Sequence, residues 1–121
     1  MIDKELIELQ KGCEATCVVI PNEESKELDS RIIINANSSD NELLKIFKEN
    51  ISSKEELNYF IINGIDQLDE DTQNKYYQIV KDREFNGYKL PKDMIIVLTV
   101  RDRKSLENIS QELYHFCVVA F

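Results

Sequence analysis

Residues 59–100 read YFIINGIDQLDEDTQNKYYQIVKDREFNGYKLPKDMIIVLTV, and this stretch carries the clearest signals of secondary structure. Two short apolar runs, at 59–62 and 94–100, enclose a longer polar segment, and the second run consists mostly of β-branched residues. Such runs are typical of buried strands. Between them, the acidic residues 69–71 precede apolar side chains at helical spacing, as at the start of a helix. The stretch therefore predicts a strand, a helix and a second strand, the unit from which parallel sheets are built.

The same alternation continues on both sides of this stretch. Three further apolar runs predict buried strands at 17–20, 31–36 and 116–121. Apolar residues at helical spacing predict helices over 3–11, from the capping residues 38–40 to about 50, and from the cap Ser105 to about Tyr114. No repeat or Gly/Ser-rich linker divides the sequence. We therefore expect residues 1–121 to form a single three-layer α/β domain, with a mostly parallel five-stranded sheet and helices on both faces.

Composition excludes several classes of protein. The net charge of −8 argues against a large phosphate-binding face, so we expect no nucleic-acid binding. No apolar run reaches the roughly 20 residues that span a bilayer, and no apolar signal region follows a basic start, so we expect no membrane contact. The three cysteines are an odd number without metal-ligand spacing, which fits a reducing compartment. We expect a cytoplasmic protein.

Two short motifs mark the segment between the strands at 59–62 and 94–100. The triplet Thr72–Asn74 stands near the start of the helix, and Gly87–Pro91 reads GYKLP before the second strand. In order and spacing, residues 59–100 resemble the part of AAA+ ATPases, especially MoxR-like and related helix-insert members, that runs from Walker B to sensor 1. In that family the helix begins near a "vQN" triplet and the connection ends in "G..LP". The resemblance implies a P-loop NTPase-like fold, here without a counterpart of the family's lid domain.

The position that matches the family's Walker A loop is degenerate. The matching stretch 20–27 reads IPNEESKE, in which Lys26 alone remains in register. A Walker A loop needs glycines so that its backbone can surround the phosphates, and this stretch has none. Its three glutamates would repel a triphosphate. We therefore expect that no phosphate is held there.

The other catalytic positions of the family are also changed. Asn63 and Gly64 stand where Walker B has the Asp that holds magnesium and the Glu that activates water. Thr99 and Arg101 are the sensor-1-like positions, with Arg101 in place of Asn, and the arginine finger falls near His115. Losing these groups together removes charge neutralisation and water activation. We expect no ATP hydrolysis, no catalytic residue, no cofactor and no metal.

Two functional hypotheses follow. The first is a non-catalytic AAA+-like protein-interaction or regulatory module that contacts another protein or copies of itself. Aromatic residues dominate interface energetics, so the candidate interaction surface is the exposed part of an aromatic group at Tyr76, Tyr77, Phe85 and Tyr88. The alternative is a small-molecule-binding protein or enzyme of an unrelated doubly wound type, with a site in the crevice at the carboxyl ends of the strands. That site would draw on Asn63, Asp66, Thr99, Arg101 and Asp102.

Other groups have simpler structural interpretations. The acidic cluster at 66–71 fits capping of a helix start better than a divalent-cation site. We interpret the cysteines as small buried hydrophobic residues and His115 as a structural or boundary residue. The basic residues of 101–104 fit a solvated edge. A receiver-like regulatory domain would need a phosphorylatable Asp where Asn63 stands, so it fits the sequence poorly.

Overall fold

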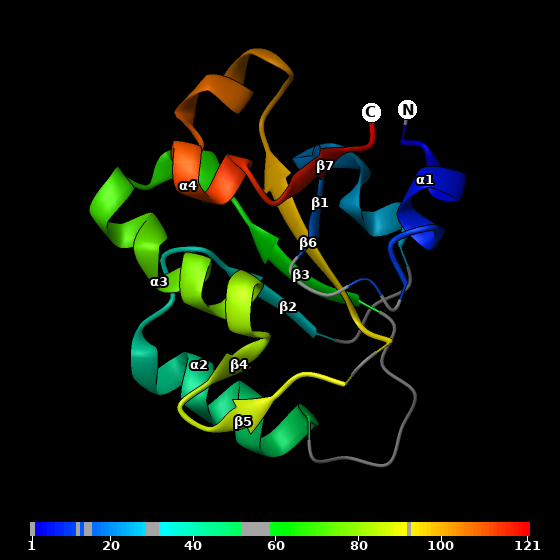
Figure 1. Cartoon of the computed structure of the whole chain (residues 1–121). Coiled ribbons are helices and arrows are strands. Elements are labelled where there is room, and N and C mark those ends of the chain that lie inside the picture. The colour runs from blue at the N-terminus through cyan, green and yellow to red at the C-terminus, as the bar shows by residue number, and fades with distance from the viewer. Residues whose placement is uncertain (1, 12, 14–15, 29–31, 52–58, 92) are drawn as a thin grey trace.

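The main sheet is five-stranded and entirely parallel in the residues described, as the sequence predicts. A computed structural model describes residues 2–11, 13, 16–28, 32–51, 59–91 and 93–121. Its strands lie side by side in the order β2-β3-β6-β1-β7 (Figure 1). Their bounds are β1 (Cys17–Pro21), β2 (Ile32–Asn35), β3 (Tyr59–Asn63), β6 (Ile95–Val100) and β7 (Cys117–Val119).

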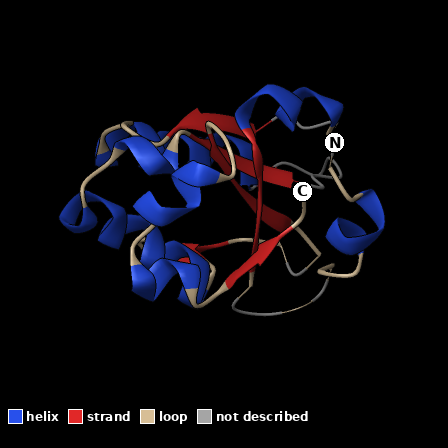
Figure 2. Ribbon diagram, turned by 90° about the horizontal axis from the view of Figure 1, so that it is seen from above, coloured by secondary structure: helices blue, strands red, loops and turns tan. Residues whose placement is uncertain are grey.

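Helices cover both faces of this sheet, which confirms the three-layer α/β prediction (Figure 2). The α-helices are α1 (Lys4–Glu8), α2 (Asp40–Ile46), α3 (Glu70–Asp82) and α4 (Gln111–Tyr114). Shorter helical turns are η1 (Asn22–Glu27), η2 (Phe47–Ile51), η3 (Ile65–Gln67) and η4 (Lys104–Asn108). Side chains of α2, α3 and α4 pack on one face, and those of α1 pack on the other. No described helix is both long and apolar enough to pass through a bilayer.

The alternation of side chains along the strands divides the core into two clusters. Phe60 and Ile62 of β3 face the cluster that contains Tyr76 of α3, whereas Ile61 faces the cluster that contains Ile7 of α1. All five of these side chains are fully buried. Because successive strand residues point to opposite faces, a strand covered on both sides must be apolar at every position. The central strand β6 is buried at all of its positions for this reason.

The expectation of a fully buried second strand is wrong at Ile33. The side chain of Ile33 is 52% exposed, and burial alternates along β2. The strand lies at the edge of the sheet, where it pairs with β3 alone. A run of three isoleucines does not distinguish a central strand from an edge strand.

The helix expected from Ser105 to about Tyr114 is divided in the structure. The turn η4 ends at Asn108, Ile109 is extended as its C-cap, and α4 then begins behind the N-cap Ser110. Ser105 is buried and is not a cap; its backbone N–H and its hydroxyl both donate to the Asp102 carboxylate. These hydrogen bonds hold the pKa of Asp102 below its usual value.

A buried glutamine explains where this helix divides. The Gln73 side chain donates to the carbonyl oxygen of Asn108, at 2.8 Å, and accepts from the backbone N–H of Ser110, at 2.7 Å. It also donates to the carbonyl oxygen of Leu68, at 2.9 Å. The bonds to Asn108 and Ser110 satisfy backbone groups that a continuous helix would use internally. Gln73 therefore fixes the break between η4 and α4.

The strand order creates one switch point in the sheet. Numbered along the chain, the five strands lie in the order 2-3-4-1-5, which differs from the 2-1-3-4-5 order of flavodoxin-like receiver domains. After β1 the chain buries Leu28 on the α1 face, and after β6 it buries Ile109 on the face of α3. The connections of β1 and β6 thus leave toward opposite faces. In open α/β sheets, ligands bind outside the carboxyl ends of the strands at such a point.

Candidate functional site

A buried threonine ties two loops to the strand β6 at the switch point. Thr99 lies near the end of β6, and its side chain is fully buried. Its hydroxyl oxygen accepts from the backbone N–H of Gly64 at 3.0 Å, and it lies 3.1 Å from the amide oxygens of both Asn22 and Asn63. Asn22 follows β1, whereas Asn63 and Gly64 end β3. The loops after β1 and β3 are therefore tied to β6 through one hydroxyl.

The single hydrogen of the Thr99 hydroxyl limits which hydrogen bonds this network can contain. A hydroxyl carries one hydrogen, so Thr99 can donate to the side-chain oxygen of Asn22 or to that of Asn63. The other asparagine completes the network when it turns its amide N–H toward the threonine oxygen. Every group involved is neutral. The network therefore forms without a cation or a phosphate at its centre.

Beside the network lies a pocket of about 230 Å³ that is lined mainly by side-chain amides. We call it the amide pocket. Its amide side chains lie at or after the carboxyl ends of β1 and of the neighbouring pair β2 and β3, and come from Asn22, Asn35, Asn37, Asn63 and Gln67. Ala36, Gly64 and Leu68 complete the lining. The amides of Asn35, Asn37 and Gln67 make no hydrogen bond with other described residues.

The charge around the amide pocket disfavours anions. None of the residues that line the pocket is charged. The charged residues directly next to lining residues in the sequence are all acidic, namely Glu23, Asp66 and Asp69. Lys26 is exposed on η1 and is not among the lining residues. In the described part of the chain, no three His, Cys, Asp or Glu side chains are placed to hold a metal ion.

Gly64 shapes the mouth of the pocket through its backbone. Its φ of +83° is in the left-handed region, which a side chain would strain. The space itself is not the constraint, since a Cβ atom would meet the side chain of Gln67 at ordinary contact distances from 3.6 Å. The left-handed turn directs the N–H of Gly64 at Thr99. The positive φ thus gives the glycine at this position a structural reason.

The five residues of the alternative site are only partly brought together. Asn63 and Thr99 meet in the network, and Asn63 also lines the amide pocket. The backbone N–H of Arg101 donates to the Asp66 carboxylate at 3.4 Å, whereas the Arg101 guanidinium extends along the surface, 3.6 Å from Asp102. Arg101 and Asp102 do not line the pocket. The second oxygen of Asp66 is buried without a hydrogen-bond partner among the described residues.

The predicted aromatic group divides between core and surface. Tyr76 is fully buried, and its hydroxyl donates to the carbonyl oxygen of Ala36. Burial raises the pKa of Tyr76 to about 12, with smaller contributions from nearby carboxylates. Tyr77 and Phe85 are half-buried and pack against the core. Tyr88 is 37% exposed. Tyr76 therefore cannot belong to an interaction surface, and Tyr88 is the exposed member of the group.

Tyr88 is held on a short hairpin that is fastened at its base. The antiparallel strands β4 (Glu84–Phe85) and β5 (Tyr88–Lys89) flank a turn with positive φ at Asn86 and Gly87. The ring of Phe85 lies 5.5 Å from that of Phe47 in the core. The guanidinium of Arg83 donates to backbone carbonyls of the segment that follows the hairpin, at Pro91 and Met94.

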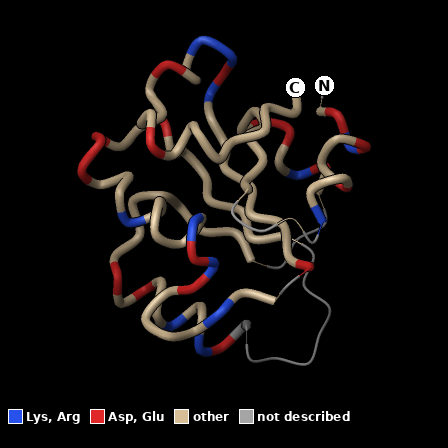
Figure 3. Tube along the Cα trace, in the orientation of Figure 1, with Lys and Arg blue, Asp and Glu red and all other residues tan. Residues whose placement is uncertain are grey.

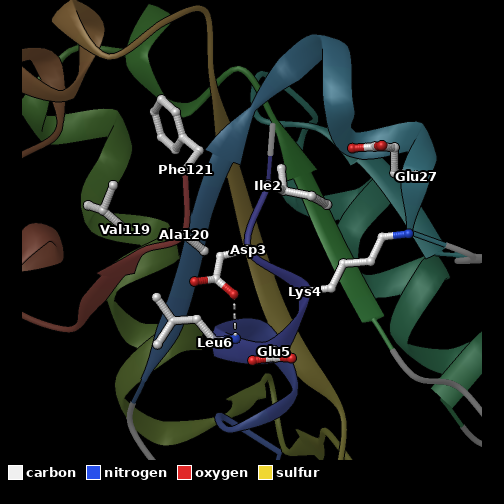
Figure 4. A pocket seen from close by; sticks show the side chains of 9 residues that line it. All are labelled: Ile2, Asp3, Lys4, Glu5, Leu6, Glu27, Val119, Ala120 and Phe121. Carbon is white, nitrogen blue, oxygen red and sulfur yellow. Dashed lines mark hydrogen bonds between the residues drawn. The ribbon is translucent and has the colours of Figure 1, made fainter.

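A second hollow lies where the two ends of the chain run together (Figures 1 and 4). The backbone N–H of Asp3 donates to the carbonyl oxygen of Ala120 at 2.8 Å, so the start of the chain follows the end of β7. The hollow has a volume of about 680 Å³ and mixes apolar side chains such as Phe121 with charged ones such as Lys4 and Glu27. Its residues do not form a recognisable catalytic arrangement. It is an open, mixed surface.

The remaining candidates lie apart from this site. His115 is exposed, and its ring packs edge-on against Phe116 at 5.5 Å. In the loop of residues 101–104, the acidic Asp102 stands between basic residues. Elsewhere along the described chain, lysine and arginine residues are scattered (Figure 3). Cys17 and Cys117 are register partners on β1 and β7, with their sulfur atoms 3.5 Å apart. The hydrogen bond with Cys117, together with burial, raises the pKa of Cys17.

The amides of the pocket carry a signal that sequence reasoning missed. An asparagine stands at or directly after the end of each of the strands β1, β2 and β3. The carboxyl ends of parallel strands meet at one edge of the sheet, so three such residues are expected to lie close together. Asn22 and Asn35 could have been found in this way, whereas Asn37 lies two residues beyond the end of β2. Gln67 carries no comparable signal, because the turn η3 brings it to the pocket.

The sequence has no recognised relatives in two comparisons. No protein-family model matches it, and no curated protein is similar to it at a significant level. Function is therefore inferred from the residues of the site and from the resemblance within residues 59–100.

Proposed function

We propose that this chain is a degenerate AAA+-like domain that does not hydrolyse ATP and acts as a protein-interaction or regulatory module. The observation that carries the proposal is the neutral network at Thr99. The positions that resemble Walker A, Walker B and sensor 1 contribute Asn22, Asn63 and Thr99, and their side chains lie within hydrogen-bond distance of one another. This convergence fits the family, in which the same three segments surround the nucleotide phosphates.

The chemistry of these positions argues against catalysis. Phosphoryl transfer requires neutralisation of the phosphate charge and a positioned nucleophile. The side chains at the network are neutral amides and a hydroxyl, and Lys26 is exposed outside the pocket. A hydrogen-bonded network of protein groups also occupies donors and acceptors that a ligand phosphate would need. The domain would therefore serve through its surface and not through turnover.

The hairpin that carries Tyr88 is the best-supported contact surface. Its base is fixed by Phe85 and Arg83, so Tyr88 is presented with little conformational freedom to lose on binding. Exposed aromatic side chains are enriched among residues that contribute most to interface affinity. The partner we propose is another protein or a second copy of this chain. The protein would act in the cytoplasm.

Light scattering over a concentration series tests the self-association form of this proposal. We expect a mass that rises with concentration in the wild type and a weaker rise in Tyr88→Ala. The matched control is Tyr114→Ala, which removes an exposed tyrosine from α4 and not from the hairpin. A monomeric mass at every concentration in all three proteins would contradict self-association. An equal effect of both substitutions would contradict the role of the hairpin.

A small-molecule-binding function is the second candidate, because the structure has a polar pocket at the strand ends. Its position beside the switch point between β1 and β6 is where doubly wound folds bind ligands. This candidate does not exclude protein contacts, since the hairpin and the pocket use different residues. It predicts a ligand that stabilises the fold.

A further inference from the structure

We propose that the amide pocket binds a small, neutral, hydroxyl-rich compound, about the size of one sugar ring. This inference rests on the second candidate function and names its ligand class. It is independent of the protein contacts proposed for Tyr88, because the hairpin does not line the pocket. Its failure would therefore leave the interaction-module proposal unchanged.

The first support is the hydrogen-bonding capacity of the lining. A side-chain amide offers two N–H donors and one carbonyl acceptor, and a ligand hydroxyl both donates and accepts. Asn35, Asn37 and Gln67 make no side-chain hydrogen bond with other described residues, so this capacity is available to a ligand. A compound with several hydroxyl groups matches such a lining better than an apolar compound, which would leave amides without partners.

The second support is charge. The pocket has no lysine or arginine in its lining, and its sequence neighbours Glu23, Asp66 and Asp69 are acidic. A phosphate or carboxylate would gain no ion pair with the lining, and the ammonium of Lys75, which donates to the carbonyl oxygen of Ser38 next to Asn37, is already paired with Asp40. The lining also lacks an aromatic ring on which a nucleobase could stack. Nucleotides and anionic metabolites are therefore disfavoured.

The third support is size and rigidity. The volume of about 230 Å³ is below the roughly 300 Å³ at which pockets for drug-sized ligands begin. Thr99 holds Asn22 and Asn63 within one network, so part of the lining is positioned before a ligand arrives. Such preorganisation lowers the entropy that binding costs. The ligand is accordingly a small molecule and not a polymer chain.

The test is a titration of the isotopically labelled protein, followed by amide chemical shifts. The neutral probes are glucose, myo-inositol and glycerol; glucose 6-phosphate is an anionic analogue of the first. We expect saturable shifts with at least one neutral probe, centred on residues of the pocket, and no tighter binding of the anionic analogue. Asn35→Ala and Asn37→Ala should each weaken binding about fivefold, as expected for one lost hydrogen bond.

The matched control is Asn74→Ala, which removes an exposed asparagine from α3, outside the pocket. Both pocket positions are exposed, so the substitutions should leave the unfolding temperature close to that of the wild type. The absence of saturable shifts with all three neutral probes would overturn the proposal. Tighter binding of glucose 6-phosphate than of glucose would overturn it too, as would an equal loss of binding in Asn74→Ala.

Discussion

The hydroxyl oxygen of Thr99 lies 3.1 Å from the amide oxygen of Asn63, near the carboxyl ends of the neighbouring strands β6 and β3. Thr99 is fully buried, and it also accepts from the backbone N–H of Gly64. Direct bonding between these residues makes the strand ends a structural junction. The stability of the fold should therefore depend on the threonine hydroxyl.

Replacing Thr99 with valine keeps the shape of the side chain but removes the hydroxyl. The N–H of Gly64 then loses its partner, so we expect the free energy of unfolding to fall by about 1–3 kcal/mol. Equilibrium unfolding in urea measures the change. Thr72→Val, on the exposed surface of α3, is the matched control; it loses only the solvent-exposed bond of its hydroxyl to Asp69 and should change stability by less than about 0.5 kcal/mol. Equal effects of the two substitutions would show that the network contributes no stability.

Replacing Gln73 with methionine should destabilise the fold by at least about 2 kcal/mol. Methionine has a similar length, yet it leaves backbone groups of Leu68, Asn108 and Ser110 without their side-chain partner. The same substitution at Gln78, which is exposed on α3, is the control. Urea unfolding compares the two. A neutral effect at Gln73 would mean that water replaces its three bonds at no cost.

The raised pKa of Tyr76 predicts that the stability of the fold changes with pH in the alkaline range. Its pKa is about 12 in the folded protein, against 10 for a fully solvated tyrosine side chain, so the unfolded chain releases its proton first. The contribution of Tyr76 to stability is therefore complete below pH 10 and is lost as the pH rises toward 12. In Tyr76→Phe this loss should be smaller, although Tyr59 behaves in the same way because burial and Glu8 raise its pKa to about 12.

Unfolding of wild type and Tyr76→Phe in urea at neutral and alkaline pH measures this difference. At neutral pH the variant should be less stable by about 1 kcal/mol, since the carbonyl of Ala36 loses its hydroxyl donor. The difference between the two proteins should narrow above pH 10. A difference that stays constant or widens would contradict the buried, protonated state of Tyr76.

The cysteines should differ in their reactivity toward alkylating reagents. Cys13 is exposed, whereas Cys17 is buried on β1 and its pKa is raised by the hydrogen bond with Cys117 and by burial. Because the thiolate is the reactive form, we expect iodoacetamide to label Cys13 in the native protein and Cys17 after unfolding. Peptide mass spectrometry identifies the labelled sites, with Cys13→Ser as the control. Native labelling of Cys17 at the rate of Cys13 would contradict the packing of β1 against β7.

Much of the fold was predictable because local patterns determine it. The apolar runs and the helix start at Asp69 gave the strands and α3 close to their observed bounds, and the Asp69 side chain accepts from the backbone N–H of Thr72 as a cap. Long-range contacts determined the rest. The exposure of Ile33 depends on the position of β2 at the sheet edge, and the break before α4 depends on Gln73, which is distant in sequence.

The candidate site was predicted only in part for a related reason. Asn63 and Thr99 were identified because each stands near the end of an apolar strand, and the structure brings them together. Arg101 and Asp102 also follow a strand, but the chain turns there and leaves both side chains largely on the surface. The sequence did not show that Tyr76 is buried and Tyr88 exposed, since both are tyrosines in an amphipathic region.

The decisive measurement is a titration of the protein with ATP and with ADP in the presence of magnesium, followed by calorimetry and by the unfolding temperature. A ligand present at 100 times its dissociation constant raises the free energy of unfolding by about 2.7 kcal/mol, so binding would be visible as a higher unfolding temperature. Our account predicts no heat of binding and no change in that temperature. Stabilisation by either nucleotide that requires magnesium would contradict it, because the neutral network at Thr99 would then not have replaced a nucleotide site.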